Sequence, residues 1–361
     1  MQSPQIPPDI AALIDYERYA KVNLNEQAWA YIYGGSGDEV SARQNETAYR
    51  QIKLLNRVLK DVSKGHTKTT LLGHTLAHPI ILAPVAYQKL AHPDGEIGSA
   101  LAAEAQDGLF VLSTLASTSL EQVAGSSSGQ KWFQLYFQSQ KEHTLDLVRR
   151  AEKAGYSALM ITVDAPINGL RNREQRAGFS LPPGICAENC TEYQAQSAGN
   201  EGKSTVFQGL MKTAPTWDDI AWIGDNTRLP IIIKGIINPQ DAKEAKAHNV
   251  AGIVISNHGG RTLDTLPSPI DVLPAIRHQV GPDLPLLIDS GIRRGTDIFK
   301  ALALGANAVM IGRPVFYGLA TAGALGVAHT IRLLRDELEL TMALCGCTSL
   351  NDISVNHIWQ K

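Results

Sequence analysis

The chain has 361 residues, of which 44% are hydrophobic and 19% charged, a balance typical of a globular protein and unlike that of disordered or fibrous chains. The formal net charge is -2, so the composition offers no basic surface for nucleic acid or for an anionic membrane. We find no apolar run long enough to span a bilayer and no signal-peptide pattern after Met1, which predicts a cytoplasmic protein without a membrane anchor.

Residues 1–78 predict a helical preface. Apolar residues recur with helical spacing over residues 10–24 and 26–33, and the glycine-rich segment 34–37 ends the second of these helices. The helical pattern resumes over residues 38–56.

Eight short apolar runs then follow, each typical of a strand that is buried on both faces. They are residues 80–82, 109–112, 132–136, 158–163, 231–233, 252–255, 286–288 and 308–311. Helical patterns lie between most of them, at residues 95–105, 144–154, 239–247 and 296–304. Eight strands alternating with helices favour an α/β fold, a (β/α)8 TIM barrel, in one domain over residues 1–361. A doubly wound open sheet is the structural alternative.

Two further segments complete the chain. Residues 177–215 form a long polar interruption after the fourth strand, and a loop of this length is typical of a mobile lid or of a disordered segment. Residues 324–334 and 337–344 have the apolar spacing of two covering helices. The four cysteines, at 186, 190, 345 and 347, lack the spacing of a zinc site, which predicts reduced thiols and no metal.

Polar or small residues follow each predicted strand. In chain order they are Pro84, Val85 and Ala86, then Ser113, Gln134, Tyr136, Asp164, Lys234, Ser256, Asn257, His258, Asp289, Ser290, Gly291, Gly312 and Arg313. In a barrel these positions meet at the C-terminal face, where active sites are built. Their convergence at eight strand ends indicates an enzyme.

The sixth of these strand ends carries the densest chemistry. His258 can accept a proton near neutral pH, and Arg261 can bind a carboxylate or phosphate through its planar guanidinium. Gly259 and Gly260 permit a sharp turn or a close approach to a ligand. A plain glycine turn with a solvated His and Arg is the alternative. Arg171 either joins Arg261 in binding a carboxylate or forms surface salt bridges.

The last two strands predict a phosphate site. Residues 289–295 lead into a helix and Arg313 follows the eighth strand, so backbone N–H groups at a helix start would combine with arginine side chains. Lys234 is open to two interpretations. It is either a counter-charge to an anionic cofactor or, with a lowered pKa, the Schiff-base nucleophile of an aldolase.

Together these residues resemble the FMN-dependent L-2-hydroxy-acid oxidase/dehydrogenase family, over residues 15–358. The motifs that carry the resemblance are Tyr31 with residues 34–35, and residues 83–86, 132–136, 162–164, 234–235, 256–261, 289–295 and 312–313. The resemblance implies that His258 is the catalytic base, that Asp164 supports it, and that Tyr136 contacts the substrate hydroxyl.

The resemblance also implies the binding residues. The substrate carboxylate would be bound by Tyr31, Arg171 and Arg261, with Tyr136 beside them. The FMN cofactor would be bound by Pro84, Val85, Ala86, Ser113, Gln134, Thr162, Lys234, Ser256, Asp289, Ser290, Gly291, Arg293, Gly312 and Arg313. In this reading Lys234 stabilises the reduced cofactor instead of forming a Schiff base.

The implied activity is oxidation of an L-2-hydroxy acid, with L-lactate to pyruvate as the first expectation and O2 as acceptor, giving H2O2. A dehydrogenase with another acceptor, or one acting on an aromatic acid such as a mandelate, is the alternative within the family. An aldolase acting through Lys234 and a flavin-binding protein without turnover are the alternatives outside it. The family likeness implies a homotetramer or octamer. Leu115 replaces a tryptophan of glycolate oxidases, which predicts room for larger acids, and Ser290 replaces a usual glycine.

Overall fold

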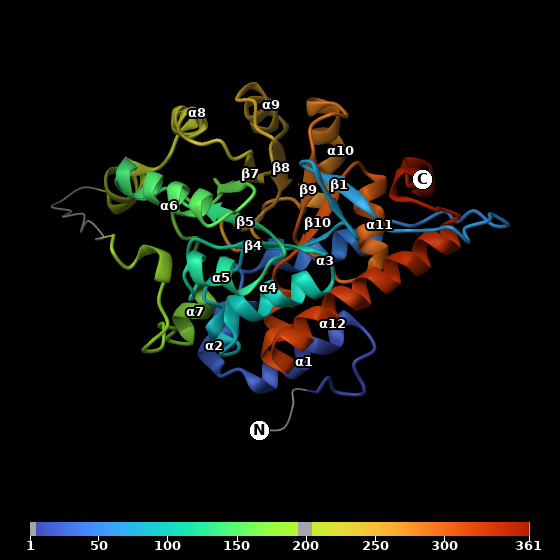
Figure 1. Ribbon diagram of the computed structural model, residues 1–361, viewed down its shortest axis with the longest axis horizontal. Helices are drawn as coiled ribbons and strands as arrows, with labels where there is room; N and C mark the ends of the chain where they lie inside the picture. The colour runs from blue at the N-terminus through green and yellow to red at the C-terminus, as the bar shows by residue number, and fades with distance from the viewer. Residues whose placement is uncertain (1–4, 194–203, 361) are drawn as a thin grey trace.

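The computed structural model describes residues 5–193 and 204–360. Eight parallel strands form a closed barrel in the order β10-β3-β4-β5-β6-β7-β8-β9 (Figure 1). The strands are β3 (Ile80–Leu82), β4 (Leu109–Leu112), β5 (Gln130–Leu135), β6 (Leu159–Thr162), β7 (Ile231–Ile236), β8 (Gly252–Ile255), β9 (Leu286–Ile288) and β10 (Ala308–Ile311). The predicted (β/α)8 barrel is therefore confirmed, and the open sheet is excluded.

Successive residues of each strand point alternately into and out of the barrel. Ile81, Val111, Trp132 and Met160 belong to the cluster that fills the barrel interior. Their neighbours, such as Phe110, belong to the larger cluster between strands and helices. Both faces are thus apolar, which explains why the strands read as continuous apolar runs in the sequence.

Helices surround the barrel. They are α4 (Gly95–Ala105), α5 (Leu120–Ser126), α6 (Lys141–Lys153), α7 (Asn172–Arg176), α8 (Trp217–Asn226), α9 (Pro239–Ala247), α10 (Pro269–Val280), α11 (Gly295–Ala303) and α12 (Arg313–Cys345). The predictions for α4 and α9 match the observed bounds. We did not predict α10, which starts at Pro269 and contains Pro274, because proline inside a helix normally breaks it.

The C-terminal helical region differs from the prediction. We expected two helices separated near residue 335, but helix α12 continues through that point. Its break lies earlier, at Ala322 and Gly323, where Gly323 has a left-handed φ of 57°. By length and composition α12 could span a membrane, contrary to our expectation, yet 67% of its most apolar window is buried inside the molecule. Such burial is typical of a core helix.

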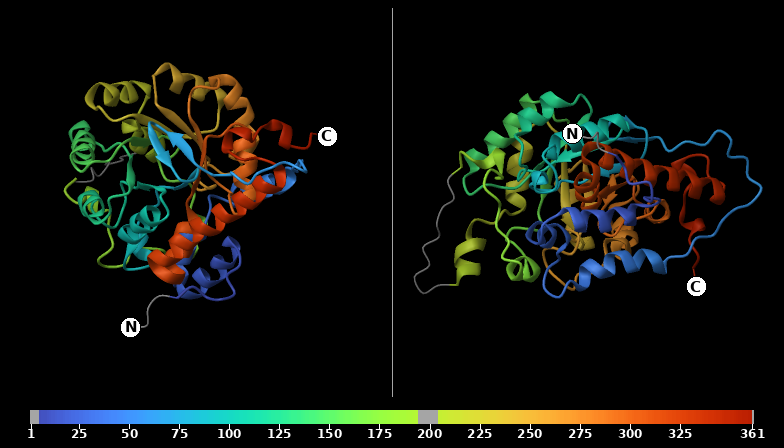
Figure 2. Two further views of the ribbon diagram at one scale, coloured as in Figure 1. Left: turned by 45° about the vertical axis from the view of Figure 1, so that its right-hand side comes forward. Right: turned by 90° about the horizontal axis from the view of Figure 1, so that it is seen from below.

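The preface contains α1 (Leu13–Asn23), α2 (Glu26–Tyr33) and α3 (Val40–Gln51). Helix α1 lies along α12 (Figure 1). The preface is not wholly helical, since an antiparallel hairpin of β1 (Thr69–Leu71) and β2 (His74–Leu76) follows α3. Leu71 and Leu76 pack against the interior residues of the barrel, so the hairpin covers one of its ends (Figure 2). Its alternating pattern over three-residue strands was too short for us to detect.

The segment after the fourth strand is irregular. It contains α7 and short turns at Glu188–Cys190 and Leu210–Thr213. Part of the predicted lid, residues 194–203, lies outside the described residues. The lid function of residues 177–215 therefore stays a prediction.

Candidate active site

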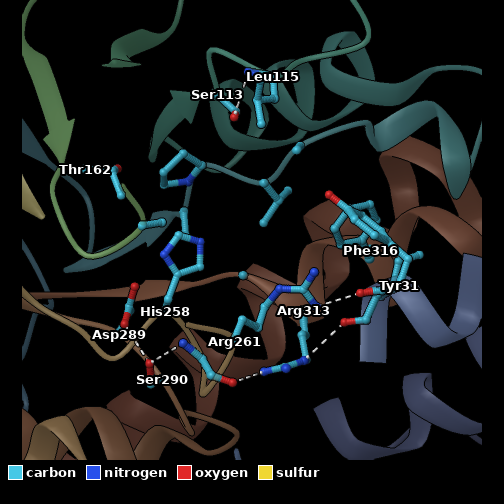
Figure 3. A pocket seen from close by; sticks show the side chains of 18 of the residues that line it. Tyr31, Ser113, Leu115, Thr162, His258, Arg261, Asp289, Ser290, Arg313 and Phe316 are labelled. Atoms are coloured by element: carbon cyan, nitrogen blue, oxygen red, sulfur yellow. Dashed lines mark hydrogen bonds between the residues drawn. The ribbon is translucent and has the colours of Figure 1, made fainter. Parts of the chain in front are cut away.

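A cavity of about 390 Å³ lies at the C-terminal ends of the strands. Every barrel strand contributes lining residues at or after its C-terminal end, and α2 of the preface closes one side with Tyr31 and Ile32. The predicted site residues that line it are Tyr31, Pro84, Val85, Ala86, Ser113, Gln134, Tyr136, Thr162, Arg171, Lys234, His258, Arg261, Asp289, Ser290, Gly291, Arg293, Gly312 and Arg313. Figure 3 shows Ser113 and Leu115 on one side of His258, with Asp289 and Ser290 on the other. Asp164 and Ser256 are the two predicted residues that lie behind this lining.

His258 and Asp164 form a hydrogen-bonded pair. The His258 Nδ1 atom lies 2.9 Å from Asp164 Oδ1. Because a carboxylate can only accept, Nδ1 carries the proton, and the other ring nitrogen, Nε2, is left as a proton acceptor. His258 has a left-handed φ of 58°, an uncommon conformation for a residue with a side chain.

Burial and nearby charges shift the pKa values of both residues of this pair. Burial lowers the pKa of His258 below its usual value, and the nearby Asp164 carboxylate only partly reverses this. For Asp164, burial raises the pKa but His258 and Lys234 outweigh it, so the pKa lies below its usual value. At neutral pH the site therefore contains a neutral imidazole held by an anionic carboxylate.

Gly235 provides the space for Asp164. The pairing of β7 with β8 shifts register between Lys234 and Ile236, and Gly235 has a φ of 110° at this irregularity. A Cβ atom on Gly235 would lie 2.5 Å from the Asp164 Cγ. Glycine is required here both for its backbone conformation and for this close approach.

Lys234 is a buried cation at the end of β7. Its Nζ lies 3.1 Å from Asp289 Oδ2 and donates to Ser256 Oγ at 3.0 Å. Burial lowers the pKa of Lys234, but Asp289 and Asp164 outweigh it, so its pKa lies above the usual lysine value. A lysine kept protonated in this way is a poor Schiff-base nucleophile. Ser256 also accepts a hydrogen bond from the His258 backbone N–H, which ties the two functional groups together.

Arg171 and Arg261, which we call the arginine clamp, lie at the same part of the cavity. Glu174 Oε1 is 3.6 Å from Arg171 Nη1 and 3.3 Å from Arg261 Nη2. Arg261 Nη1 donates to the backbone carbonyls of Tyr31 and Gly34, and its guanidinium lies over the Tyr31 ring. Arg171 Nε and Nη1 are buried without a hydrogen-bond partner among the described residues. These donors are available to a ligand carboxylate.

Tyr31 and Tyr136 complete this end of the cavity. Burial raises the pKa of both phenols, so each keeps its proton and can donate a hydrogen bond. Phe179 stacks on Tyr31 with 4.6 Å between ring centroids. The Tyr31 ring is therefore fixed between Phe179 and Arg261.

The predicted phosphate end differs in one respect from our expectation. The backbone N–H groups of Arg293 and Arg294 both donate to Asp297 Oδ2 at 3.0 Å, and that of Gly295 donates to Glu337. The start of α11 is thus already capped and does not offer these donors to a phosphate. The helix start that lines the cavity is that of α12, at Arg313.

Two glycines of the strand-end loops are needed for packing. Gly260, for which we expected a sharp turn or a close approach to a ligand, has a left-handed φ of 72°, and a Cβ on it would lie 2.5 Å from Ala42 N. A Cβ on Gly291 would lie 2.2 Å from Asn45 O. Both glycines therefore allow the strand-end loops to pack against α3 of the preface. Ser290, which replaces a usual glycine of the family, has a left-handed φ of 73° and so keeps a conformation that glycine would adopt.

Three comparisons with known proteins agree with this geometry. Residues 20–360 match the model of the family described as FMN-dependent dehydrogenase. The chain belongs to the FMN-dependent dehydrogenase family. It is 48% identical to an L-lactate oxidase of Alicycliphilus denitrificans, covering 98% of this chain and 97% of the relative. It is 42% identical to glycolate oxidase 1 of Zea mays, covering 97% and 96%.

Solved structures in this family have the same fold. Mandelate oxidase with (S)-2-phenylpropionate aligns with a TM-score of 0.88 at 38% identity, covering 97% of this chain and 98% of that one. The resemblance that the sequence motifs indicated is confirmed.

The residues of the cavity fit an FMN cofactor. Gln134 Oε1 accepts from Ser113 Oγ and Thr114 N, which leaves the buried Gln134 Nε2 without a partner among the described residues. Arg293 Nε is likewise buried and unpaired within the described part of the chain. These two unpaired donors and the Lys234 cation all line the cavity, and such groups suit a polar ring that carries a phosphate.

Sequence reasoning missed several residues of the site. Glu174, Asn168, Phe179 and Phe316 line the cavity. Glu174 lies three residues after Arg171, for which surface salt bridges were the alternative to a role in the site. The sequence gives no sign of Phe179, because it follows an irregular turn without apolar periodicity. The number of charges after Arg171, in a segment next to a predicted active site, was the one available indication for Glu174.

Proposed function

We propose that this FMN-dependent enzyme oxidises an L-2-hydroxy acid to the 2-keto acid, with L-lactate to pyruvate as the preferred reaction, and that O2 is the acceptor and H2O2 the second product. The observation that carries the proposal is one cavity that is lined both by His258, whose Nδ1 is bound to Asp164 behind it, and by the arginine clamp. A base and a carboxylate site in one cavity are what removal of a proton from a hydroxy acid requires. The likeness to L-lactate oxidases supports the choice of substrate.

The arginine clamp would bind the substrate carboxylate. Arg171 has unused N–H donors, and Arg261 is fixed by the carbonyls of Tyr31 and Gly34. Burial lowers the pKa of Arg171 to about 10, which still leaves it charged at neutral pH. Two fixed guanidinium groups would orient the acid and so lower the entropic cost of reaching the reactive geometry.

His258 would accept the substrate proton at Nε2. Asp164 holds the ring in the required tautomer and stabilises the imidazolium that forms. The Tyr136 phenol, which stays protonated, would donate to the substrate oxygen. Lys234 also lines the cavity, stays cationic and would stabilise developing negative charge.

When bound, FMN would supply the two-electron redox chemistry between the hydroxy acid and O2. Gln134, Lys234, Ser113, Thr162 and the backbone at Ala86 would contact its ring. Arg293, Gly291, Gly312 and Arg313 would contact its phosphate end. Ser256 would act through Lys234 and His258, since it does not line the cavity.

We extend the proposal to the cellular setting. A cytoplasmic location fits the free thiols of Cys345 and Cys347, which are buried. A homo-oligomer, a tetramer or octamer, fits the family likeness. Size-exclusion chromatography with light scattering tests the oligomeric state.

Anaerobic addition of L-lactate to the yellow protein tests the activity. We expect rapid bleaching of the visible absorbance band, and stoichiometric H2O2 after oxygen is admitted. Glycolate and L-mandelate in parallel rank the substrates. A protein that binds FMN but is bleached by none of the three acids would contradict the proposal. Recovery of colour with an added dye but not with oxygen would indicate the dehydrogenase alternative.

A further inference from the structure

Among the residues that the structure describes, Glu174 is the one carboxylate that contacts both arginines of the clamp. It lines the cavity, and its side chain is 15% exposed. Its Oε1 atom lies between the guanidinium groups of Arg171 and Arg261, at 3.6 and 3.3 Å. It therefore contributes one negative charge beside two positive charges, at the place where the substrate carboxylate would bind.

The position of Glu174 is fixed by its neighbours. Helix α7, which carries it, is attached to the preface by Arg173, whose Nε and Nη2 donate to the two carboxylate oxygens of Glu39 at 2.7 and 2.6 Å. The backbone of Leu170 accepts from Gly37 N at 2.9 Å on the other side of Arg171. A bidentate ion pair and a backbone hydrogen bond restrain this segment on both sides of the clamp.

The net charge of the arginine clamp determines how many negative charges of a bound acid it can balance. With Arg171, Arg261 and Glu174 ionised, the clamp has one net positive charge. Lys234 does not add to it, because Asp289 Oδ2 lies 3.1 Å from its Nζ. Arg313 donates to the same Gly34 carbonyl as Arg261, but the FMN phosphate would balance its charge. One substrate carboxylate brings the clamp to neutrality, whereas a dicarboxylate leaves an unpaired buried negative charge.

We propose that Glu174 is a specificity residue that makes this site select monocarboxylate 2-hydroxy acids over dicarboxylates. The inference rests on the proposed function and adds the charge class of its substrate. Glu174 does not touch the reacting atoms. It acts through Arg171 and Arg261, and it repels a second anionic group.

Glu174→Gln tests the charge, because it keeps the shape of the side chain and removes the negative charge. Two ligands of nearly the same size and shape are the probes: oxalate, a dianion, and oxamate, a monoanion. Isothermal titration of FMN-loaded protein gives both affinities without turnover. We expect the oxalate-to-oxamate affinity ratio to rise on the order of tenfold, because Glu174→Gln removes one like charge from a partly buried site with an effective dielectric of about 20 that salt screens only in part.

Two variants serve as controls. Glu174→Asp keeps the charge and should keep the ratio near that of the wild type, even if both affinities fall. Glu339→Gln makes the same change of net charge on the exposed face of α12, where Glu339 pairs with Arg335, and should leave both affinities unchanged. The ratio of kcat/KM for L-malate to that for L-lactate should rise with Glu174→Gln in the same direction.

The outcomes are distinct. Equal losses for oxalate and oxamate in Glu174→Gln would show that Glu174 only supports the clamp, and would overturn the charge-selection proposal while leaving the proposed function intact. Failure of the wild-type protein to bind either acid would overturn the clamp itself, and with it both proposals.

Discussion

His258, the proposed catalytic base, has a strained backbone conformation. A left-handed φ of 58° costs free energy in a residue with a side chain, and it is sustained here by the hydrogen bonds of the backbone N–H to Ser256 Oγ and of Nδ1 to Asp164. With this backbone conformation, the imidazole of His258 lines the cavity. The burial that accompanies this placement is also what lowers its pKa.

The pH dependence of kcat/KM should reflect that lowered pKa. His258 must be neutral to accept a proton, so kcat/KM should be constant from neutral pH down to the ordinary histidine value of about 6.5 and fall only below it. Steady-state rates with L-lactate between pH 4.5 and 8 measure this. Asp164→Asn should move the acid limb to still lower pH, because Asp164 raises the pKa of His258. An acid limb centred above 6.5 would contradict the lowered pKa.

Gly235→Ala should damage catalysis more than cofactor binding. The new Cβ would lie 2.5 Å from the Asp164 Cγ, so Asp164 must move and His258 loses its partner. Loss of an orienting carboxylate in a base pair lowers kcat by roughly two to three orders of magnitude. Stopped-flow bleaching with L-lactate measures the rate, and the visible spectrum measures FMN content.

Gly155→Ala is the matched control for this change. Gly155 also has a positive φ, of 82°, but a Cβ there meets nothing within 4 Å. It therefore reproduces the backbone strain without touching the site. Equal loss of rate in both variants would show that strain alone, and not the displacement of Asp164, is responsible.

At the scale of elements, α12 is bent so that its first part packs against its second. A Cβ on Gly326 would lie 2.1 Å from the carbonyl oxygen of Gly318. The left-handed Gly323 permits the bend that brings the two parts together. Because the backbones of the two parts are in contact at Gly318 and Gly326, a side chain on either of these glycines would push the two parts of α12 apart.

Gly326→Val should therefore destabilise the protein strongly. Overpacking of this kind costs about 1–3 kcal/mol or more of the free energy of unfolding. Urea denaturation followed by circular dichroism measures it. Gly125→Ala in α5, where a Cβ would meet nothing within 4 Å, should instead be neutral or slightly stabilising. If Gly326→Val matched Gly125→Ala, the close crossing of the two parts would be wrong.

The elements show where sequence reasoning succeeds and where it fails. Each barrel strand was predictable because burial on both faces leaves a continuous apolar run. The bend of α12 was not, because the apolar spacing continues through it and Gly323 is one of several glycines in the segment. Tertiary contacts determine which of those glycines adopts a positive φ, and the sequence does not show these contacts.

The whole molecule joins the preface to the barrel at the active site. Asn45 of α3 and Asn257 after β8 exchange two amide hydrogen bonds, at 2.9 and 2.7 Å, across 212 positions of sequence. Arg313 donates to the carbonyls of Ile32 and Gly34. We predicted the barrel contribution to the site from strand ends, and only Tyr31 from the preface, through the family resemblance. Contacts such as Asn45–Asn257 have no local pattern in sequence, because a single polar residue within a polar helix reads as exposed.

Removal of FMN should lower the thermal stability of the whole molecule. The free donors of Gln134 and Arg293 are buried, so a ligand that pairs with them binds only the folded state. At free FMN about 1,000-fold above its Kd, this linkage adds about 4 kcal/mol, which corresponds to a Tm rise of about 5 °C for a chain of this length. Differential scanning calorimetry of the FMN-free and reconstituted protein measures the shift.

Riboflavin and Arg293→Gln separate the phosphate from the ring in this stabilisation. Riboflavin has the same ring and no phosphate, so it should raise the Tm less than FMN does. Arg293→Gln should reduce the FMN shift toward the riboflavin value and leave the riboflavin shift unchanged, because Arg293 Nε then no longer pairs with phosphate. Glu46, which Arg293 contacts at 3.1 Å, keeps a second partner in Arg50, so the FMN-free Tm should change little. Equal reductions for both ligands would place Arg293 at the ring or in the general stability of the barrel, and would leave Arg313 and the start of α12 as the phosphate site.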